Sequence, residues 1–148
     1  MSDYILRLIP DQPGFLPTVT DQEIRGEVQR FNLNASNVII KAYESIKFID
    51  AGQNFGYILC PVCREQITVE WWQEAMNGAW QTEFLDLVYP MSCCHAKVSL
   101  KDLIYEWKVG FARFCIEIYN PIRELSDQEH LSLEQLVGVK LNSIYCYL

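Results

Sequence analysis

The stretch Gly110–Tyr119, GFARFCIEIY, is rich in apolar and aromatic residues and precedes an Asn-Pro pair, so it predicts a strand. Ser126 then predicts the N-cap of a helix that Gly138 closes, and residues 139–148 predict a second strand. The apolar face expected for this helix consists of Leu131, Leu133, Leu136 and Val137. We therefore expect the last third of the chain to form a β-α-β unit.

The first third of the chain predicts the same arrangement. Residues 4–9 form an apolar strand, and Thr20 or Asp21 is the expected N-cap of the helix that follows. Two extended runs come next, at 38–41 and 43–49, and they predict one strand and an added one. Two β-α-β units match the split β-α-β (ferredoxin-like) plan of an α+β fold, in which helices cover one face of an antiparallel sheet.

An insert separates these two units. We expect an α+β body at residues 1–54 and 108–148 and a zinc-ribbon-like insert at 55–107. Within the insert, the residue patterns predict a strand at 55–59, a hairpin arm at 64–69, a short helix at 71–76, a strand at 84–89 and a capped helix at 99–103.

The insert carries two cysteine clusters, Cys60-Pro61-Val62-Cys63 and Cys93-Cys94-His95. A C-P-x-C turn lets two thiolates point at one ion, and a second such turn completes a tetrahedron. A regular second turn would need a cysteine at position 91, where Met91 stands. We therefore predict a metal site made by Cys60, Cys63, Cys93 and Cys94, with His95 as the substitute if two adjacent cysteines cannot both bind.

The predicted metal is a structural zinc ion. Four protein ligands leave no open position to activate water, so the zinc would fold the insert, whose core is too small to be stable alone. The alternative is that Cys93 and Cys94 are simply small buried residues. The two remaining cysteines, Cys115 and Cys146, lie in predicted strands and are expected to be buried thiols without chemistry.

Several blocks of the chain resemble a group of small uncharacterised bacterial proteins. They are FIDAGQNF at 48–55, CPVC at 60–63, WWQEAM at 71–76, the Cys93-Cys94 pair, SLKDL at 99–103 and GFARF at 110–114. The chain differs from that group in having Ser92 where the group has Pro and His95 where it has Gly. The resemblance implies a bacterial origin and a zinc-binding insert, and it implies no activity.

Charge and motif content exclude several functions. Twelve basic against nineteen acidic residues give a net charge of −7 and a pI near 4.8, which disfavours binding to nucleic acid. No apolar run reaches the roughly 18 residues of a membrane span, and no export signal is visible, so we expect a cytoplasmic protein. No nucleophile, phosphate-binding or zinc-protease motif is present, and Asp50, Glu70, Glu74, Glu83 and His130 form no catalytic pattern, so we expect no enzyme.

The sequence therefore favours a non-catalytic module that binds a protein partner. Within this class, an immunity or inhibitor protein that neutralises a basic toxin fits the small size and the acidity. One alternative is a zinc-ribbon adaptor in a regulatory or nucleic-acid complex, for which Lys97, Lys101, Lys108 and Arg113 are the available basic residues. Another is a thiol redox protein that uses Cys60 and Cys63. The four tryptophans, Trp71, Trp72, Trp80 and Trp107, are expected to pack mainly between insert and body.

Overall fold

The computed structural model describes residues 3–52 and 55–148 and has a mixed α+β fold, which confirms the predicted class. The main sheet consists of β1 (Tyr4–Pro10), β2 (Asn37–Ile49), β7 (Gly110–Tyr119) and β8 (Leu141–Tyr147). Its strand order is β2-β7-β1-β8, and every neighbouring pair is antiparallel. β2 and β8 are therefore the two edges of this sheet, and we call the sheet with its helices the body.

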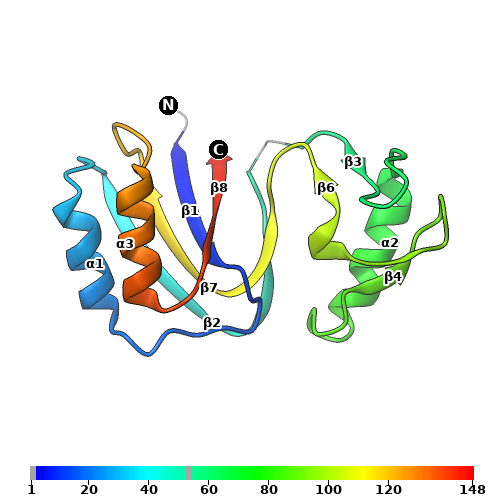
Figure 1. Ribbon diagram of the computed structural model, residues 1–148, viewed down its shortest axis with the longest axis horizontal. Coiled ribbons are helices and arrows are strands. Elements are labelled where there is room, and N and C mark those ends of the chain that lie inside the picture. The colour runs from blue at the N-terminus through cyan, green and yellow to red at the C-terminus, as the bar shows by residue number, and fades with distance from the viewer. Residues whose placement is uncertain (1–2, 53–54) are drawn as a thin grey trace.

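Two helices, α1 (Asp21–Arg30) and α3 (Asp127–Val137), lie side by side on one face of the sheet (Figure 1). Each begins with a capping box, formed by Thr20 with Glu23 in α1 and by Ser126 with Glu129 in α3. Gly138 ends α3 as predicted, and it takes the left-handed conformation, with φ 91°. The helices bury an apolar core against the sheet, which includes Leu6, Leu8, Ile24, Val28, Phe114, Ile116, Leu133 and Val137.

The insert lies beside the main sheet, away from α1 and α3 (Figure 1). It contains two small antiparallel sheets. One pairs β3 (Ile58–Leu59) with β6 (Ile104–Tyr105), and the other pairs β4 (Val88–Pro90) with β5 (Lys97–Ser99). Along the chain, α2 (Val69–Trp80) lies between β3 and β4, and the 3₁₀-helix η1 (Leu100–Asp102) lies between β5 and β6.

The core of the insert continues into the body. Ile46 of β2 and Phe111 of β7 belong to the same buried cluster as the apolar residues of the insert. The Phe111 ring lies 5.3 Å from that of Phe84 and 5.4 Å from that of Phe48, which in turn lies 5.7 Å from the ring of Trp72. These aromatic contacts fix the insert to the ends of two body strands.

The prediction of an added strand in the first third of the chain is wrong. Residues 38–41 and 43–49 belong to one strand, β2, whose pairing with β7 shifts register between Ala42 and Lys47. A β-bulge bends a strand without ending it, and such a bend resembles two strands in sequence. The apolar helix face also differs from the prediction at Leu131, which is 52% exposed.

The elements of the insert have other boundaries than predicted. α2 runs from Val69 to Trp80 rather than over 71–76, because Thr68 caps it through the main-chain N–H of Trp71. The predicted strands at 55–59 and 84–89 shorten to Ile58–Leu59 and Val88–Pro90, and the hairpin arm at 64–69 reduces to a single bridge between Leu59 and Gln66. The capped helix at 99–103 is a 3₁₀-helix after Ser99. The sequence also predicts a turn at residues 50–54, and its last two residues, Gln53 and Asn54, lie outside the described residues.

Candidate metal centre

The first cysteine turn follows β3 directly. The N–H of Cys60 donates to the carbonyl of Glu65 at 2.9 Å, and the N–H of Arg64 donates back to the carbonyl of Cys60 at 2.9 Å. Arg64 takes a left-handed conformation, with φ 67°. The turn is therefore closed on itself and holds Cys60 and Cys63 on one side.

The second turn joins β4 to β5 and repeats the same hydrogen bonds. The N–H of Met91 donates to the carbonyl of Ala96, and the N–H of His95 donates to the carbonyl of Met91, each at 2.9 Å. His95 has φ 61° and corresponds to Arg64 of the first turn. Met91 therefore stands at the position of Cys60, and Cys94 stands at the position of Cys63.

This repeat explains the irregular second motif. Met91 is 1% exposed and belongs to the insert core, so the first cysteine position of the second turn has become a packing position. Cys93 supplies the missing thiol from the middle of the turn. His95 lies at the left-handed position and is exposed, and it is not part of the cluster.

The two turns bring the four predicted cysteines together. Their Sγ atoms all lie within 4.8 Å of one another. The Sγ atoms of Cys60 and Cys94 are 3.8 Å apart, and those of Cys63 and Cys93 are 3.3 Å apart. Sulfurs at the corners of a tetrahedron with zinc–sulfur bonds of about 2.3 Å would lie about 3.8 Å apart. The cluster could therefore hold a metal ion with little movement of the side chains.

The cluster lies at the border between the insert core and solvent. Cys60 is fully buried and Cys94 is half-buried, whereas Cys63 and Cys93 are exposed. Burial would raise the pKa of Cys60, but hydrogen bonds from the main-chain amides of Cys63 and Val62 outweigh it and lower the pKa to about 7. Although Cys93 as a whole is exposed, desolvation of its thiol within the cluster and hydrogen bonds with the neighbouring thiols raise its pKa to about 12. The Cys60 thiolate therefore forms readily, and a cation would be needed to stabilise a thiolate at Cys93.

The other predicted or candidate residues do not join this cluster. Within residues 3–52 and 55–148, the four cysteines are the only group of three or more metal-binding side chains close enough to share an ion. Cys115 and Cys146 are buried in the body, as predicted, and burial raises the pKa of Cys115 to about 12. The Asp50 carboxylate accepts a hydrogen bond from the N–H of Gly52, as in an Asx turn.

His130 lies on a charged helix face, where the sequence predicts a solvated side chain, but the structure leaves it half-buried. Its Nε2 lies 2.9 Å from the carbonyl oxygen of Leu141, at the start of β8, and 3.5 Å from a carboxylate oxygen of Glu134. His130 therefore helps to hold α3 against an edge of the sheet. The acidic residues Glu70 and Glu74 are exposed on α2, and Glu83 lies beyond its C-terminal end.

The face of the main sheet that α1 and α3 do not cover carries a buried charge network, which the sequence analysis did not predict. Glu117 is 2% exposed, and its carboxylate lies 2.9 Å from Nε of Arg7 and 3.0 Å from Nζ of Lys41. Arg7 also reaches Asp50 at 3.2 Å. The signal in the sequence is that Arg7 and Glu117 are charged residues within mainly apolar strands, as Arg113 is too.

The geometry around Cys60 differs from that of a thioredoxin-type motif, in which the cysteines begin a helix. Here a turn at residues 61–63 follows Cys60, and the next helix, α2, begins only at Val69. Of the four basic residues considered for a nucleic-acid interface, Lys101 and Lys108 line one cavity, while Arg113 donates to the carbonyl of Tyr43.

Fold and site together define an α+β protein with a four-cysteine cluster that could bind a metal ion. Comparison with protein-family models, with curated proteins and with solved structures found no match for the chain. Among the described residues, no helix is both long and apolar enough to span a membrane.

Proposed function

We propose that the protein is a non-catalytic module that binds a protein partner, and that its four-cysteine cluster holds a structural zinc ion. The observation that carries the zinc proposal is the convergence of two matching turns, which leaves four Sγ atoms within 4.8 Å of one another. Four thiolates in a tetrahedron are the typical ligand set of structural zinc, and they leave no position for a reacting water.

The zinc ion would hold the insert together. One ligand pair follows the β3–β6 sheet and the other follows β4, so a bound ion would tie the two small sheets to each other. The pattern of two short hairpin-like turns around one ion supports a zinc-ribbon-like insert at 55–107. The strand order β2-β7-β1-β8 supports a split β-α-β, ferredoxin-like body at 1–54 and 108–148.

The binding role rests on aromatic side chains exposed where insert and body meet. Phe55, Tyr57, Trp107 and Tyr147 are 52%, 44%, 41% and 44% exposed. Trp107 and Tyr147 come from opposite sides of this junction, and their rings lie 6.5 Å apart. Aromatic residues that remain exposed together are typical of protein interfaces, where tryptophan and tyrosine contribute most of the binding free energy.

Charge suggests the kind of partner. The net charge of −7 would attract a basic protein and repel nucleic acid. We therefore propose a basic protein partner, with neutralisation of a bacterial toxin as the role. All six cysteines are unpaired, which fits a cytoplasmic location where thiols stay reduced.

The zinc proposal is tested by elemental mass spectrometry of natively purified protein. We expect one zinc per chain, and Cys60→Ser or Cys94→Ser should lose it and melt at a lower temperature. Cys115→Ala is the matched control, because this thiol lies in the body core, and it should keep the metal. Retention of stoichiometric zinc by either serine variant, with unchanged melting, would contradict the ligand set. A metal-free protein with Cys60 and Cys63 joined in a disulfide would favour the redox alternative.

The partner proposal is tested by capture from a lysate of the source organism. We expect one basic protein in stoichiometric amount, and Trp107→Ser should weaken its binding at least tenfold. Leu85→Ser is the control, because Leu85 is the most exposed large apolar residue of the insert at 77% and is not among the four junction aromatics. Capture of no protein, or equal binding by both variants, would count against a binding surface at this junction.

A further inference from the structure

β8 is an edge strand with a free stretch of main chain. In its pairing with β1, the main-chain N–H and C=O groups of every second residue of β8 point away from β1, towards the open edge. Two of these N–H groups have other partners: that of Leu141 donates to Glu134 at 2.8 Å, and that of Tyr147 donates to the carbonyl of Ala51. By the same alternation, Ser143 and Tyr145 face the edge. Within residues 3–52 and 55–148, the structure gives the main-chain groups of these two residues no partner at this edge.

A cavity lies on each side of this free stretch. On the side of α3, a cavity of about 330 Å³ is lined by Ser143, Tyr145, Glu124, Asp127 and His130, among others. On the side of the insert, a cavity of about 290 Å³ is lined by Ser143 and Ile144 together with Lys101 and Lys108. The two cavities share Ser143, so they flank the same point of the strand.

The two cavities carry opposite charges. Glu124 and Asp127 are exposed on the α3 side, and the ion pairs among the described residues include neither. On the insert side, Lys108 likewise has no ion pair among the described residues, and Lys101 has only a distant one, at 3.9 Å from Asp102. Consecutive side chains of an added strand point to opposite faces, so one would meet the acids and the next would meet the lysines.

We propose that β8 binds an extended segment of the protein partner as a fifth strand of the main sheet. This inference rests on the proposed binding function, and it specifies the strand that binds the partner and the charge pattern of the bound segment. Main-chain groups of Ser143 and Tyr145 pair with the segment, a Lys or Arg of the segment lies beside Glu124 and Asp127, and an Asp or Glu at an odd spacing lies beside Lys101 and Lys108.

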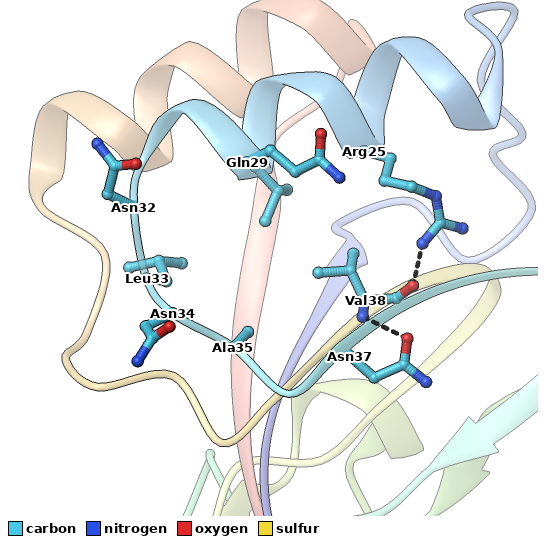
Figure 2. A pocket seen from close by; sticks show the side chains of 9 residues that line it. Arg25, Gln29, Asn32, Leu33, Asn34, Ala35, Asn37 and Val38 are labelled. Carbon is cyan, nitrogen blue, oxygen red and sulfur yellow. Dashed lines mark hydrogen bonds between the residues drawn. The ribbon is translucent and has the colours of Figure 1, made fainter.

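A second copy of the chain is a poor occupant of this edge. β8 itself reads LNSIYCY and has no charged residue, so two β8 strands paired together would leave both sets of charges unmatched. The other sheet edge is also less suited. At the start of β2, the Arg25 side chain donates to the carbonyl of Val38, and the Asn37 side chain accepts from the N–H of Val38 (Figure 2). Side chains therefore already bind both main-chain groups of Val38.

The test uses zinc-loaded full-length protein and a phage library of random twelve-residue peptides. We expect enriched peptides to carry a basic and an acidic residue at an odd spacing. Binding of the synthesised peptides is then measured by fluorescence anisotropy. Ser143→Pro removes only an N–H that faces the edge, where proline is tolerated, and should weaken binding at least tenfold.

Charge reversal keeps the test valid if Ser143→Pro fails to fold. Lys108→Glu changes an exposed side chain and should weaken binding at least tenfold, and a peptide with its acidic residue replaced by Lys should regain affinity for this variant. Lys97→Glu is the matched control, because Lys97 is exposed on β5 and lines neither cavity; it should bind as the wild type does.

Each remaining outcome overturns the inference. Peptides that bind Ser143→Pro and Lys108→Glu as tightly as the wild type would place binding on another face, and the proposed binding function would survive. Failure to enrich any peptide, while a protein is still captured from the lysate, would likewise exclude strand addition. A dimer in sedimentation that Ser143→Pro dissociates would assign the edge to a second copy.

Discussion

Glu117 is a charged residue in β7, where every residue except Arg113 and Tyr119 is buried. It is 2% exposed, and both of its carboxylate oxygens have cationic partners, Arg7 at 2.9 Å and Lys41 at 3.0 Å. Arg7 joins Glu117 on β7 to Asp50, just beyond β2, so the network crosses three strands of the sheet. Burying such charges costs desolvation free energy, and that cost is offset only while every partner is present.

Removing one partner should therefore be far more harmful than removing the network. We expect Glu117→Gln to lower the free energy of unfolding by about 3 kcal/mol, because Arg7 would stay buried without its main counter-charge. Urea unfolding followed by circular dichroism measures this change. The double variant Arg7→Met with Glu117→Leu should recover most of the loss, and a double variant as unstable as the single one would contradict this account.

Glu129 makes a pH-dependent contribution at the start of α3. A hydrogen bond from Arg123, aided by the main-chain N–H of Ser126, lowers the pKa of Glu129 from 4.5 to about 2. A carboxylate with a lowered folded pKa stabilises the protein above pH 4.5, and this stabilisation disappears as the pH falls from 4.5 towards 2.

We expect Glu129→Gln to cost about 1 kcal/mol at pH 7 and progressively less as the pH falls towards 2, since only the ionised form gains from these partners. The measurement is the difference in unfolding free energy between wild type and variant across this pH range. Acid also releases metal from the cysteines, but it does so in both proteins, so this effect cancels in the difference. Glu23→Gln is the control. It changes the equivalent capping box of α1, which has no arginine partner among the described ion pairs, and its effect should be smaller. An equal effect of both variants would assign the contribution to capping alone.

At the scale of elements, capping and periodicity were the features that could be predicted from the sequence. Thr20 and Ser126 cap their helices as expected, and Gly110–Tyr119 forms the expected strand. The bulge in β2 could not be predicted, because it depends on how β2 pairs with β7. The spacing predicted the four cysteines and Met91 at the position where a regular turn has a cysteine, but it did not predict that Met91 packs into the insert core.

The link between β2 and the insert depends on Gly52. This residue has φ 71° and bridges Tyr147 at the end of β8, so the chain leaving β2 lies against the opposite edge strand. A Cβ atom at this position would meet the carbonyl oxygen of Tyr147 and would lie 2.8 Å from Sγ of Cys146. Both neighbours belong to a paired strand and cannot move away easily.

Gly52→Ala should therefore lower the free energy of unfolding by about 2 kcal/mol or more, from the left-handed backbone and the contact with β8 together. Gly26→Ala is the matched control with the opposite sign. Gly26 lies inside α1, where nothing stands within 4 Å of a new Cβ, so alanine should stabilise the protein by about 0.5–1 kcal/mol. Thermal melting of the two variants measures both effects, and a stabilised Gly52→Ala would show that the contact with β8 is absent in solution.

At the scale of the whole molecule, body and insert each bury an apolar cluster, and the cluster of the insert includes Ile46 and Phe111 of the body strands. The body packs α1 and α3 on one face of its sheet and holds the charge network on the other. The insert packs its short sheets and α2 around its own cluster, which meets the body at Phe111. The sequence predicted a body at 1–54 and 108–148 and an insert at 55–107 from two β-α-β patterns and the cysteine clusters between them, and these bounds stay a prediction. It could not predict which strand edges stay free, because that depends on the order of strands in space.

Removal of zinc should unfold the insert and leave the body folded. All four tryptophans lie in the insert or at its return to the body, so tryptophan fluorescence reports on the insert, whereas amide exchange of β1 and β7 reports on the body. We expect a strong chelator to shift the tryptophan emission to longer wavelength and to abolish exchange protection in α2, because an insert of this size needs the metal for its folding free energy. Protection in β1 and β7 should persist, since their partners are the body strands and helices. Readdition of zinc should reverse the change in the wild type and fail to reverse it in Cys60→Ser. Loss of exchange protection throughout the chain on chelation would contradict this prediction, because it would mean that insert and body fold as a single cooperative unit.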